Sequence, residues 1–342
     1  MDWFERLTGF REAGYEETRA KLKVDGRRLQ SLVNGKSYRI GELELVSLQT
    51  LRERVKSVGG LSGRLKVSVV TGDVREMHRL PEYAGGLFQV ASQFNLLEMV
   101  SPDITPEHGV TRYQHDRTQG PACAIAAGAA TIYRNYFAPV AGAYGQTKER
   151  QLDGLADLGE ALSKRLGQPI EALWSMRNGY ALCTRDGLNA IANHIKLLRP
   201  EEVDTLRGKL SIGMQRDVEV TEASGEHSPV VSQAFCSALP VAYTSVPHSH
   251  WEPFASLVLE AAYECTMCEA LLNAQRGASN IVLLTLLGGG AFGNREDWIV
   301  AAIRRALEIT AGFDLDVRLV SYGTPPPLIL RMAEEFKVAA GN

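Results

Sequence analysis

One stretch near the C-terminal end of the sequence constrains the fold more than any other. Residues 281–287 are a nearly continuous apolar run of strand length, four glycines follow within residues 288–293, and a helical pattern starts near residue 297. A strand without alternating polar positions is covered on both faces, as in a sheet packed between two layers of helices. We therefore expect an α/β fold in which buried strands end in functional loops.

Apolar strand candidates alternate with helical patterns along most of the chain. The expected strands are residues 65–71, 87–92, 209–214, 218–221, part of 230–243, and 317–322. The expected helices are residues 122–135, 251–274 and 297–310. This alternation favours one sheet with helices on both of its faces.

The chain is expected to divide near residue 60. Residues 1–60 are interpreted as an N-terminal extension, with a helix over residues 3–22, a hairpin around Asn34-Gly35 and a helix over residues 47–58 that Gly59 and Gly60 close. Residues 61–342 are expected to form the α/β domain. Within it, residues 145–205 are polar and mostly helical in pattern, so we interpret them as an insertion.

Bulk composition restricts the possible partners. The 342 residues include 37 Lys and Arg against 40 Asp and Glu, which gives a net charge of −3. Strong nonspecific nucleic-acid binding requires a basic excess, so the charge does not imply a nucleic-acid partner. No run approaches the roughly 18 apolar residues of a membrane span, and the first residues lack a signal-peptide pattern. We expect no membrane partner.

Cysteine and histidine spacing gives no indication of a metal or another cofactor. Five cysteines, few and odd in number, are most simply interpreted as reduced thiols of a cytoplasmic protein. Cys265 and Cys268 have zinc-like spacing without a second ligand pair, so we expect buried thiols on a helix. His248 and His250 are expected to be loop residues.

The glycine-rich segment at residues 288–294 is the strongest functional motif. Glycines let backbone N–H groups close around phosphate oxygens, and a following helix N-terminus adds partial positive charge. The segment has no Gly-Lys-Ser/Thr ending, so it is not an ATP-type P-loop. It also lacks the spaced glycines of a dinucleotide-binding fold, which disfavours a nicotinamide-dependent oxidoreductase. A glycine-rich turn without a ligand is the alternative.

Two other strand ends carry polar groups. After the strand at residues 65–71, Asp73 could accept a hydrogen bond from an exocyclic amine such as that of adenine, and Val74 could donate its N–H; a simple turn or helix cap is the alternative. After the strand at residues 87–92 come Asn95 and Glu98. Amides suit ribose hydroxyls, and a carboxylate suits water activation or stabilisation of an oxocarbenium-like centre. A helix cap and a solvated charge are their alternatives.

The order of these motifs resembles that of macrodomains. Gly72-Asp73-Val74 follows the first core strand, Gly120-Pro121-Ala122 opens a helix, and the glycine run at residues 288–294 comes near the end. This last motif is similar to the phosphate loop of the poly(ADP-ribose) glycohydrolase-like branch. The resemblance covers roughly residues 62–325, with residues 145–205 unmatched.

The resemblance implies a three-layer α/β/α fold, with a mixed sheet, that holds ADP-ribose in a cleft. Asp73 and Val74 would contact adenine, Tyr322 would lie beside it, and residues 288–294 would surround the diphosphate. Asn95 and residues 116–122 would surround the distal ribose. The implied ligand-binding residues are Asp73, Val74, Gly120, Pro121, Ala122, Gly288, Gly289, Gly290, Ala291, Phe292, Gly293, Asn294 and Tyr322.

The sequence departs from the family where the catalytic residues are expected. The common Asn-Ala-Ala-Asn run is replaced by Ala-Ser-Gln-Phe-Asn at residues 91–95, and the paired glutamates of the glycohydrolases are absent. The candidates are Glu98 or Asp116 as the catalytic carboxylate, with Asn95 and Gln119 positioning substrate or water. We expect a hydrolase, without a cofactor, that cleaves an ADP-ribosyl linkage to an acceptor at the distal ribose. A reader that binds ADP-ribose or a related nucleotide without turnover is the alternative.

Overall fold

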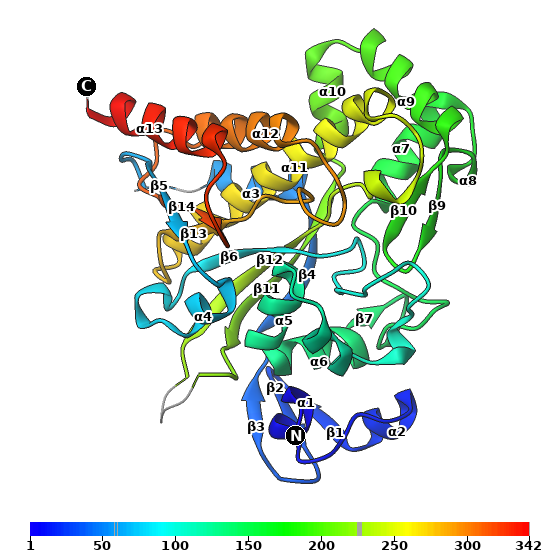
Figure 1. The fold of residues 1–342 in the computed structure, drawn as a ribbon, viewed down its shortest axis with the longest axis vertical. Helices are drawn as coiled ribbons and strands as arrows, with labels where there is room; N and C mark the ends of the chain where they lie inside the picture. The colour runs from blue at the N-terminus through cyan, green and yellow to red at the C-terminus, as the bar shows by residue number, and fades with distance from the viewer. Residues whose placement is uncertain (58, 60, 224–227, 342) are drawn as a thin grey trace.

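The computed structural model describes residues 1–57, 59, 61–223 and 228–341. Its centre is a seven-stranded sheet in the order β4-β11-β12-β6-β13-β14-β5 (Figure 1). The strands are β4 (Glu42–Ser47), β5 (Lys66–Thr71), β6 (Leu87–Ala91), β11 (Ser211–Glu219), β12 (Val230–Cys236), β13 (Ile281–Leu284) and β14 (Asp316–Ser321). The strands from β12 to β5 are parallel, and β11 and β4 add antiparallel pairs. Five strands therefore deliver their carboxyl ends to one edge of the sheet.

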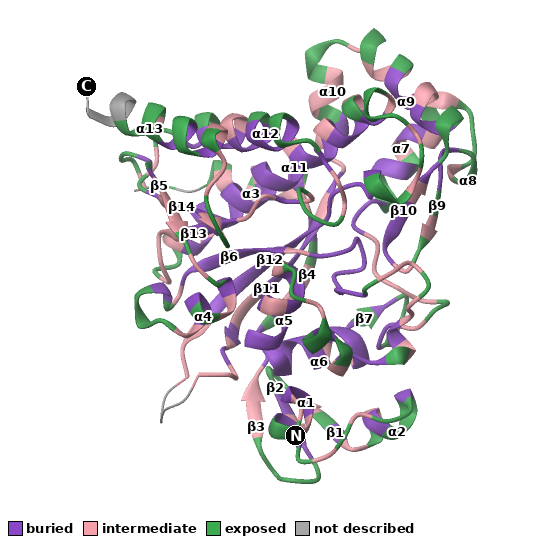
Figure 2. Ribbon diagram, in the orientation of Figure 1, coloured by how far each residue is buried: buried purple, intermediate pink, exposed green. Residues whose placement is uncertain are grey.

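Helices cover both faces of this sheet. One face packs against α3 (Leu48–Lys56), α11 (His248–Gln275), α12 (Glu296–Ile309) and α13 (Pro327–Gly341), and the other against α4 (Val74–Arg79), α5 (Gln119–Ala126) and α6 (Gly128–Tyr136) (Figure 1). Side chains alternate accordingly: on β13, Val282 and Leu284 join the core around α11, whereas Leu283 joins the core beside α4 and α5. Burial is concentrated in β6, β12 and β13 at the centre of the sheet and in the helices α5, α6 and α11 (Figure 2). The predicted three-layer α/β/α mixed sheet is confirmed.

The N-terminal segment differs from its prediction in two ways. The single helix over residues 3–22 is wrong: Gly9, at φ 79°, ends α1 (Trp3–Thr8), and α2 (Tyr15–Ala20) starts anew before β1 (Leu22–Asp25). β1 pairs with β2 (Arg28–Ser31), and the hairpin around Asn34-Gly35 joins β2 to β3 (Ser37–Arg39) as expected. In addition, β4 is an edge strand of the large sheet. The division at residue 60 stays a prediction.

The helix predicted over residues 47–58 is α3, which the Ser47 side chain caps by accepting from the Thr50 N–H. The predicted positions Val58 and Gly60 lie outside the described residues. Between α6 and β11 lie β7 (Pro139–Val140), β8 (Ala143–Tyr144), α7 (Ala156–Leu166), α8 (Ile170–Leu173), β9 (Trp174–Arg177), β10 (Tyr180–Cys183), α9 (Arg185–Leu197) and α10 (Pro200–Arg207). The 145–205 segment thus contains a β9–β10 hairpin, and its Trp174 ring stacks on Phe254 of α11 at 5.5 Å.

Three further segment predictions need correction. Residues 122–135 form two helices rather than one, because Ala127 leaves the helical region and the Gly128 N–H turns to the Thr221 hydroxyl. The extended stretches at 209–214 and 218–221 are one strand, β11, with an irregularity after Gln215. The strand predicted over residues 281–287 ends at Leu284. Beyond it, the backbone N–H groups of Thr285 and Leu287 donate to side chains instead of to a neighbouring strand.

Short 3₁₀ segments complete the fold: η1 (Pro81–Tyr83), η2 (Pro106–His108), η3 (Thr111–His115) and η4 (Val241–Tyr243). Among the described helices, none has the length and apolar character to cross a membrane. All five cysteines are buried and unpaired, as predicted for thiols.

Candidate functional site

A cavity of about 170 Å³ lies where β6, β12 and β13 end. Its walls come from residues 91–93, 98–100, 116, 118–121, 285–288 and 290–292, with Tyr180, Ala238 and Tyr243. These segments lie far apart in the sequence, and the parallel strands bring them to one edge of the sheet. This is the position at which open α/β sheets bind ligands.

One wall is the segment that we call the glycine loop, residues 285–294. Within the described part of the chain, five of its backbone N–H groups have no hydrogen-bond acceptor, those of Leu286, Gly288, Gly290, Ala291 and Phe292. All five residues line the cavity. Unpaired backbone donors that converge on a cavity are suited to binding an anion such as a diphosphate.

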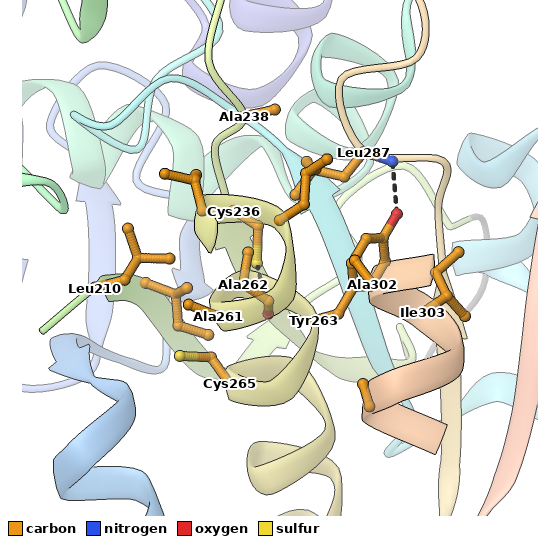
Figure 3. Packing of buried hydrophobic residues seen from close by; sticks show 14 of the residues in the cluster. Leu210, Cys236, Ala238, Ala261, Ala262, Tyr263, Cys265, Leu287, Ala302 and Ile303 are labelled. Atoms are coloured by element: carbon orange, nitrogen blue, oxygen red, sulfur yellow. Dashed lines mark hydrogen bonds between the residues drawn. The ribbon is translucent and has the colours of Figure 1, made fainter. Parts of the chain in front are cut away.

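A buried tyrosine on α11 holds the base of this loop. The Tyr263 hydroxyl donates to the Thr285 carbonyl at 2.6 Å. It also accepts from the Leu287 N–H at 2.9 Å, as Figure 3 shows. The Thr285 N–H donates to the Gln89 side chain of β6 at 3.2 Å. Because these contacts replace strand pairing, they turn the chain out of β13 and into the loop.

The glycines of the loop have different roles. Gly288 has φ 74° and Gly293 has φ 69°, so the backbone requires glycine at both positions. Gly290 has neither a positive φ nor any atom within 4 Å of a Cβ built on it, yet it lines the cavity. Local folding therefore does not require glycine at position 290, and a side chain there would occupy the cavity.

Glu98 also lines this cavity, and its carboxyl is buried without a hydrogen bond. Its side chain is 1% exposed, and neither carboxyl oxygen has a hydrogen-bond partner among the described residues. Removal from water raises the pKa of Glu98 to about 8; the Arg134 guanidinium opposes this shift and Asp116 adds to it. At neutral pH the carboxyl is therefore mostly protonated, and it can serve as a proton donor.

Arg134 does not form a hydrogen-bonded ion pair with Glu98. The shortest nitrogen–oxygen distance between them is 3.8 Å. The guanidinium instead donates to the Leu96 carbonyl and to the Gln215 and Thr131 side chains. Since these acceptors engage Arg134, Glu98 keeps its free oxygens.

Asp116 and Gln119 border the same cavity, at the start of α5. Asp116 Oδ1 accepts from the Thr118 N–H and hydroxyl, which shapes the turn into the helix. The Gln119 amide accepts from the Ala91 N–H and donates to the Gln89 carbonyl, both at 2.8 Å. Gln119 thus extends the edge of β6 with its side chain; its role in positioning substrate or water stays a prediction. Gly120 and Pro121 also line the cavity.

Three aromatic rings that the sequence did not single out as a group form a further wall. Tyr180 of β10, Tyr243 of η4 and Phe292 of the glycine loop have ring centroids 5.2 to 5.7 Å apart. Only Phe292 was a predicted site residue. Tyr180 shows that the 145–205 segment reaches the cavity, and no local sequence pattern marks such a contact.

Several predicted residues lie outside the cavity. Asn95 is fully buried; its side chain accepts from the Leu97 N–H and donates to the Gln151 side chain, so its amide is committed to the fold. Asn294 donates to the Leu239 carbonyl and fastens the end of the glycine loop. Among the other residues predicted around the diphosphate and the distal ribose, Ala122, Gly289 and Gly293 do not line the cavity.

The predicted adenine contacts lie farther along the same edge of the sheet. Asp73 caps α4 by accepting from the Arg75 N–H, and Val74 is buried in the first turn of α4. Tyr322 follows β14 and is 81% exposed. β5 and β14 are paired up to Thr71 and Ser321, so Asp73 and Tyr322 follow the ends of neighbouring strands. The cap alternative holds for Asp73, and its contact with adenine stays a prediction.

The candidate metal ligands are dispersed. The described residues contain no group of three or more His, Cys, Asp or Glu side chains arranged to hold a metal ion. Cys265 and Cys268 are buried on α11 as expected. His248 and His250 lie in its first turn rather than in a loop, and His250 contacts Asn189 at 2.6 Å.

No protein-family model matches the chain, and no curated protein matches its sequence. Solved structures of two bacterial poly(ADP-ribose) glycohydrolases are similar to it. The Deinococcus radiodurans enzyme in complex with ADP-ribose is 13% identical, with 87% of this chain and 94% of that chain covered and a TM-score of 0.46. The Thermomonospora curvata enzyme is 12% identical, with 94% and 95% covered and a TM-score of 0.42. Its structure with the inhibitor ADP-HPD has a TM-score of 0.40, at 12% identity with 95% of both chains covered.

Proposed function

We propose that this protein is a macrodomain-type hydrolase that binds ADP-ribose and cleaves its linkage to an acceptor at the distal ribose. One observation carries the proposal: a single cavity combines unpaired backbone donors in the glycine loop with the buried, unpartnered carboxyl of Glu98. The donors suit a diphosphate, and a protonated carboxyl suits departure of a glycosidic oxygen.

The order of the strands supports an extended nucleotide. Along the sheet edge, β6 brings Glu98, β13 brings the glycine loop, and β14 and β5 bring Tyr322 and Asp73. A ligand laid along this edge has its distal ribose at Glu98, its diphosphate at the glycine loop and its adenine beyond. The order of these groups along the sheet matches that of ribose, diphosphate and adenosine in ADP-ribose.

The proposed reaction uses Glu98 as the general acid. As the bond between the anomeric carbon and the acceptor atom breaks, Glu98 donates its proton to the departing atom. Water then adds to the anomeric carbon and returns one proton to the Glu98 carboxylate. The products are ADP-ribose and the protonated acceptor. Because the carboxyl is shielded by its surroundings, substrate binding must displace part of the cavity wall before this transfer.

Binding and turnover test the proposal together. We expect micromolar ADP-ribose affinity in calorimetric titration, with weaker binding of ATP and NAD. Glu98→Gln should lower the hydrolysis rate of ADP-ribosylated substrates by roughly 10²-fold or more, while ADP-ribose affinity stays within a few-fold. The exposed Glu308→Gln on α12 is the matched control and should leave both unchanged.

Two results would overturn the assignment. Absence of ADP-ribose binding would remove the nucleotide site altogether. Selective binding with no turnover of any ADP-ribosylated substrate would make the protein a reader and leave Glu98 without a catalytic role.

A further inference from the structure

Glu98 borders a second cavity, of about 250 Å³, that none of the glycine-loop residues lines. The two cavities share Glu98, Val100 and Asp116. The remaining lining residues of the second cavity are Ile104, Arg112, Tyr113 and His115. The proposed general acid therefore lies between the cavity that the glycine loop lines and a second cavity that this loop does not line.

The position of Glu98 separates the two halves of a substrate. A general acid that protonates a leaving group lies beside the bond that breaks, so the ADP-ribosyl part and the acceptor part extend to different sides of it. The glycine loop assigns the first cavity to the ADP-ribosyl part. The acceptor part of the substrate would then bind in the second cavity.

The second cavity combines cationic and apolar groups. Arg112 is exposed, and its side chain makes no hydrogen bond or ion pair with a described residue. His115 is also exposed, and Val100, 57% exposed, and Ile104 supply aliphatic surface. Asp116 also lines this cavity, and its Oδ1 is engaged by two hydrogen bonds from Thr118.

Tyr113 connects this cavity to the general acid. Its ring is buried, and its hydroxyl accepts from the Glu98 N–H at 3.1 Å. A ligand that contacts Tyr113 and Arg112 therefore lies close to the backbone that carries Glu98. The second cavity is built around the proposed acid and is not a separate surface hollow.

We propose that this second cavity is the acceptor subsite, and that it takes a peptide with an acidic residue beside the ADP-ribosylated side chain. The inference rests on the proposed function of the first cavity. An acidic side chain would pair with Arg112, and the aliphatic parts of the peptide would pack on Val100 and Ile104. Aliphatic lining and a net charge of −3 favour a peptide over a nucleic-acid strand.

Affinity measurements in the Glu98→Gln background test the subsite without turnover. The ligands are ADP-ribose and two ADP-ribosylserine peptides that differ only in flanking Asp or Lys residues. We expect the Asp-flanked peptide to bind about tenfold more tightly than the Lys-flanked one, as one charge-assisted contact predicts. Adding Arg112→Ala should reduce the difference to within about twofold and leave ADP-ribose affinity unchanged.

Arg64→Ala is the matched control. Arg64 is an exposed arginine that precedes β5, at the amino end of the parallel strands and thus at the opposite sheet edge. The Arg64→Ala protein should retain the full preference for the Asp-flanked peptide. Arg112→Glu should reverse the preference.

The outcomes separate the two proposals. If ADP-ribose itself does not bind, both the proposed function and the acceptor subsite that rests on it are wrong. If ADP-ribose binds but the peptides bind equally, or if Arg64→Ala has the same effect as Arg112→Ala, the acceptor subsite is wrong. Tighter, Arg112-dependent binding of an ADP-ribosylated oligonucleotide than of the acidic peptide would overturn the choice of a peptide.

Discussion

At Gly290 the fold tolerates a side chain, whereas the proposed ligand needs the space that a side chain would fill. Its backbone permits any side chain and the space beyond its Cα is empty, so the fold is expected to tolerate substitution. Gly289 is different, because a Cβ there would lie 3.1 Å from Ile299 Cδ1, on the packed side of the loop. A carboxylate introduced at position 290 is therefore expected to affect ligand binding, whereas one introduced at position 289 would also disturb the packing of the loop against α12.

We predict that Gly290→Glu lowers ADP-ribose affinity by more than about tenfold, because the new carboxylate displaces and repels the diphosphate. The melting temperature should change little. The control is Gly312→Glu, since Gly312 also has open space around its Cβ and lies before β14, at the opposite end of the strand. Calorimetric titration and thermal unfolding measure both effects. Unchanged affinity in Gly290→Glu would show that the glycine loop does not bind the diphosphate.

At the level of elements, α11 determines where the glycine loop starts. This 28-residue helix is buried over most of its length, and Tyr263 connects it to the loop through two hydrogen bonds, of which Figure 3 shows the one to Leu287. Gln89 connects the same loop to β6, and its own carbonyl accepts from Gln119 of α5. A helix on each face of the sheet thus supports one wall of the cavity.

We predict that Tyr263→Phe lowers the free energy of unfolding by about 1–3 kcal/mol, because the Leu287 N–H and the Thr285 carbonyl lose a buried partner. ADP-ribose affinity should also fall, since the loop is no longer held at its base. Tyr144→Phe, at an exposed position, is the control for both measurements. Stability loss with full ADP-ribose affinity would show that the hydroxyl supports the core but not the loop.

At the level of the whole molecule, the buried Glu98 links folding stability to pH. Its pKa is raised from 4.5 to about 8, so the folded state binds this proton more tightly than the unfolded state does. The stability that this group contributes is fully present below about pH 4.5 and is lost as the pH rises through about 8.

Glu98→Gln should therefore remove part of the fall in the free energy of unfolding at alkaline pH. We predict that between pH 5 and pH 9 the free energy of unfolding of the unsubstituted protein falls by several kcal/mol relative to that of the variant. Urea unfolding at both pH values measures this, with Glu308→Gln as the exposed control. Parallel pH dependence in all three proteins would mean that the Glu98 carboxyl is not held in a desolvated state.

The sequence by itself determined the features that depend on neighbouring residues. Short apolar runs indicate β5, β6 and β14, because a few consecutive residues are enough to recognise a buried strand. The long apolar stretch of α11 indicates a buried helix. The glycine loop is visible because its glycines are consecutive. Glu98 and Asp116 could be selected because they follow or precede such elements.

Only the tertiary structure decided which of these groups act together. Pairing of β13 with β6 brings residues 285–292 to Glu98, and a hairpin in the 145–205 segment adds Tyr180. Asn95 was a reasonable ribose ligand in the sequence, but Gln151 engages its amide. The proton affinity of Glu98 depends on burial and on Arg134, 36 positions away in the chain. Strand order, desolvation and side-chain partners arise from contacts between distant residues, and local sequence patterns do not encode them.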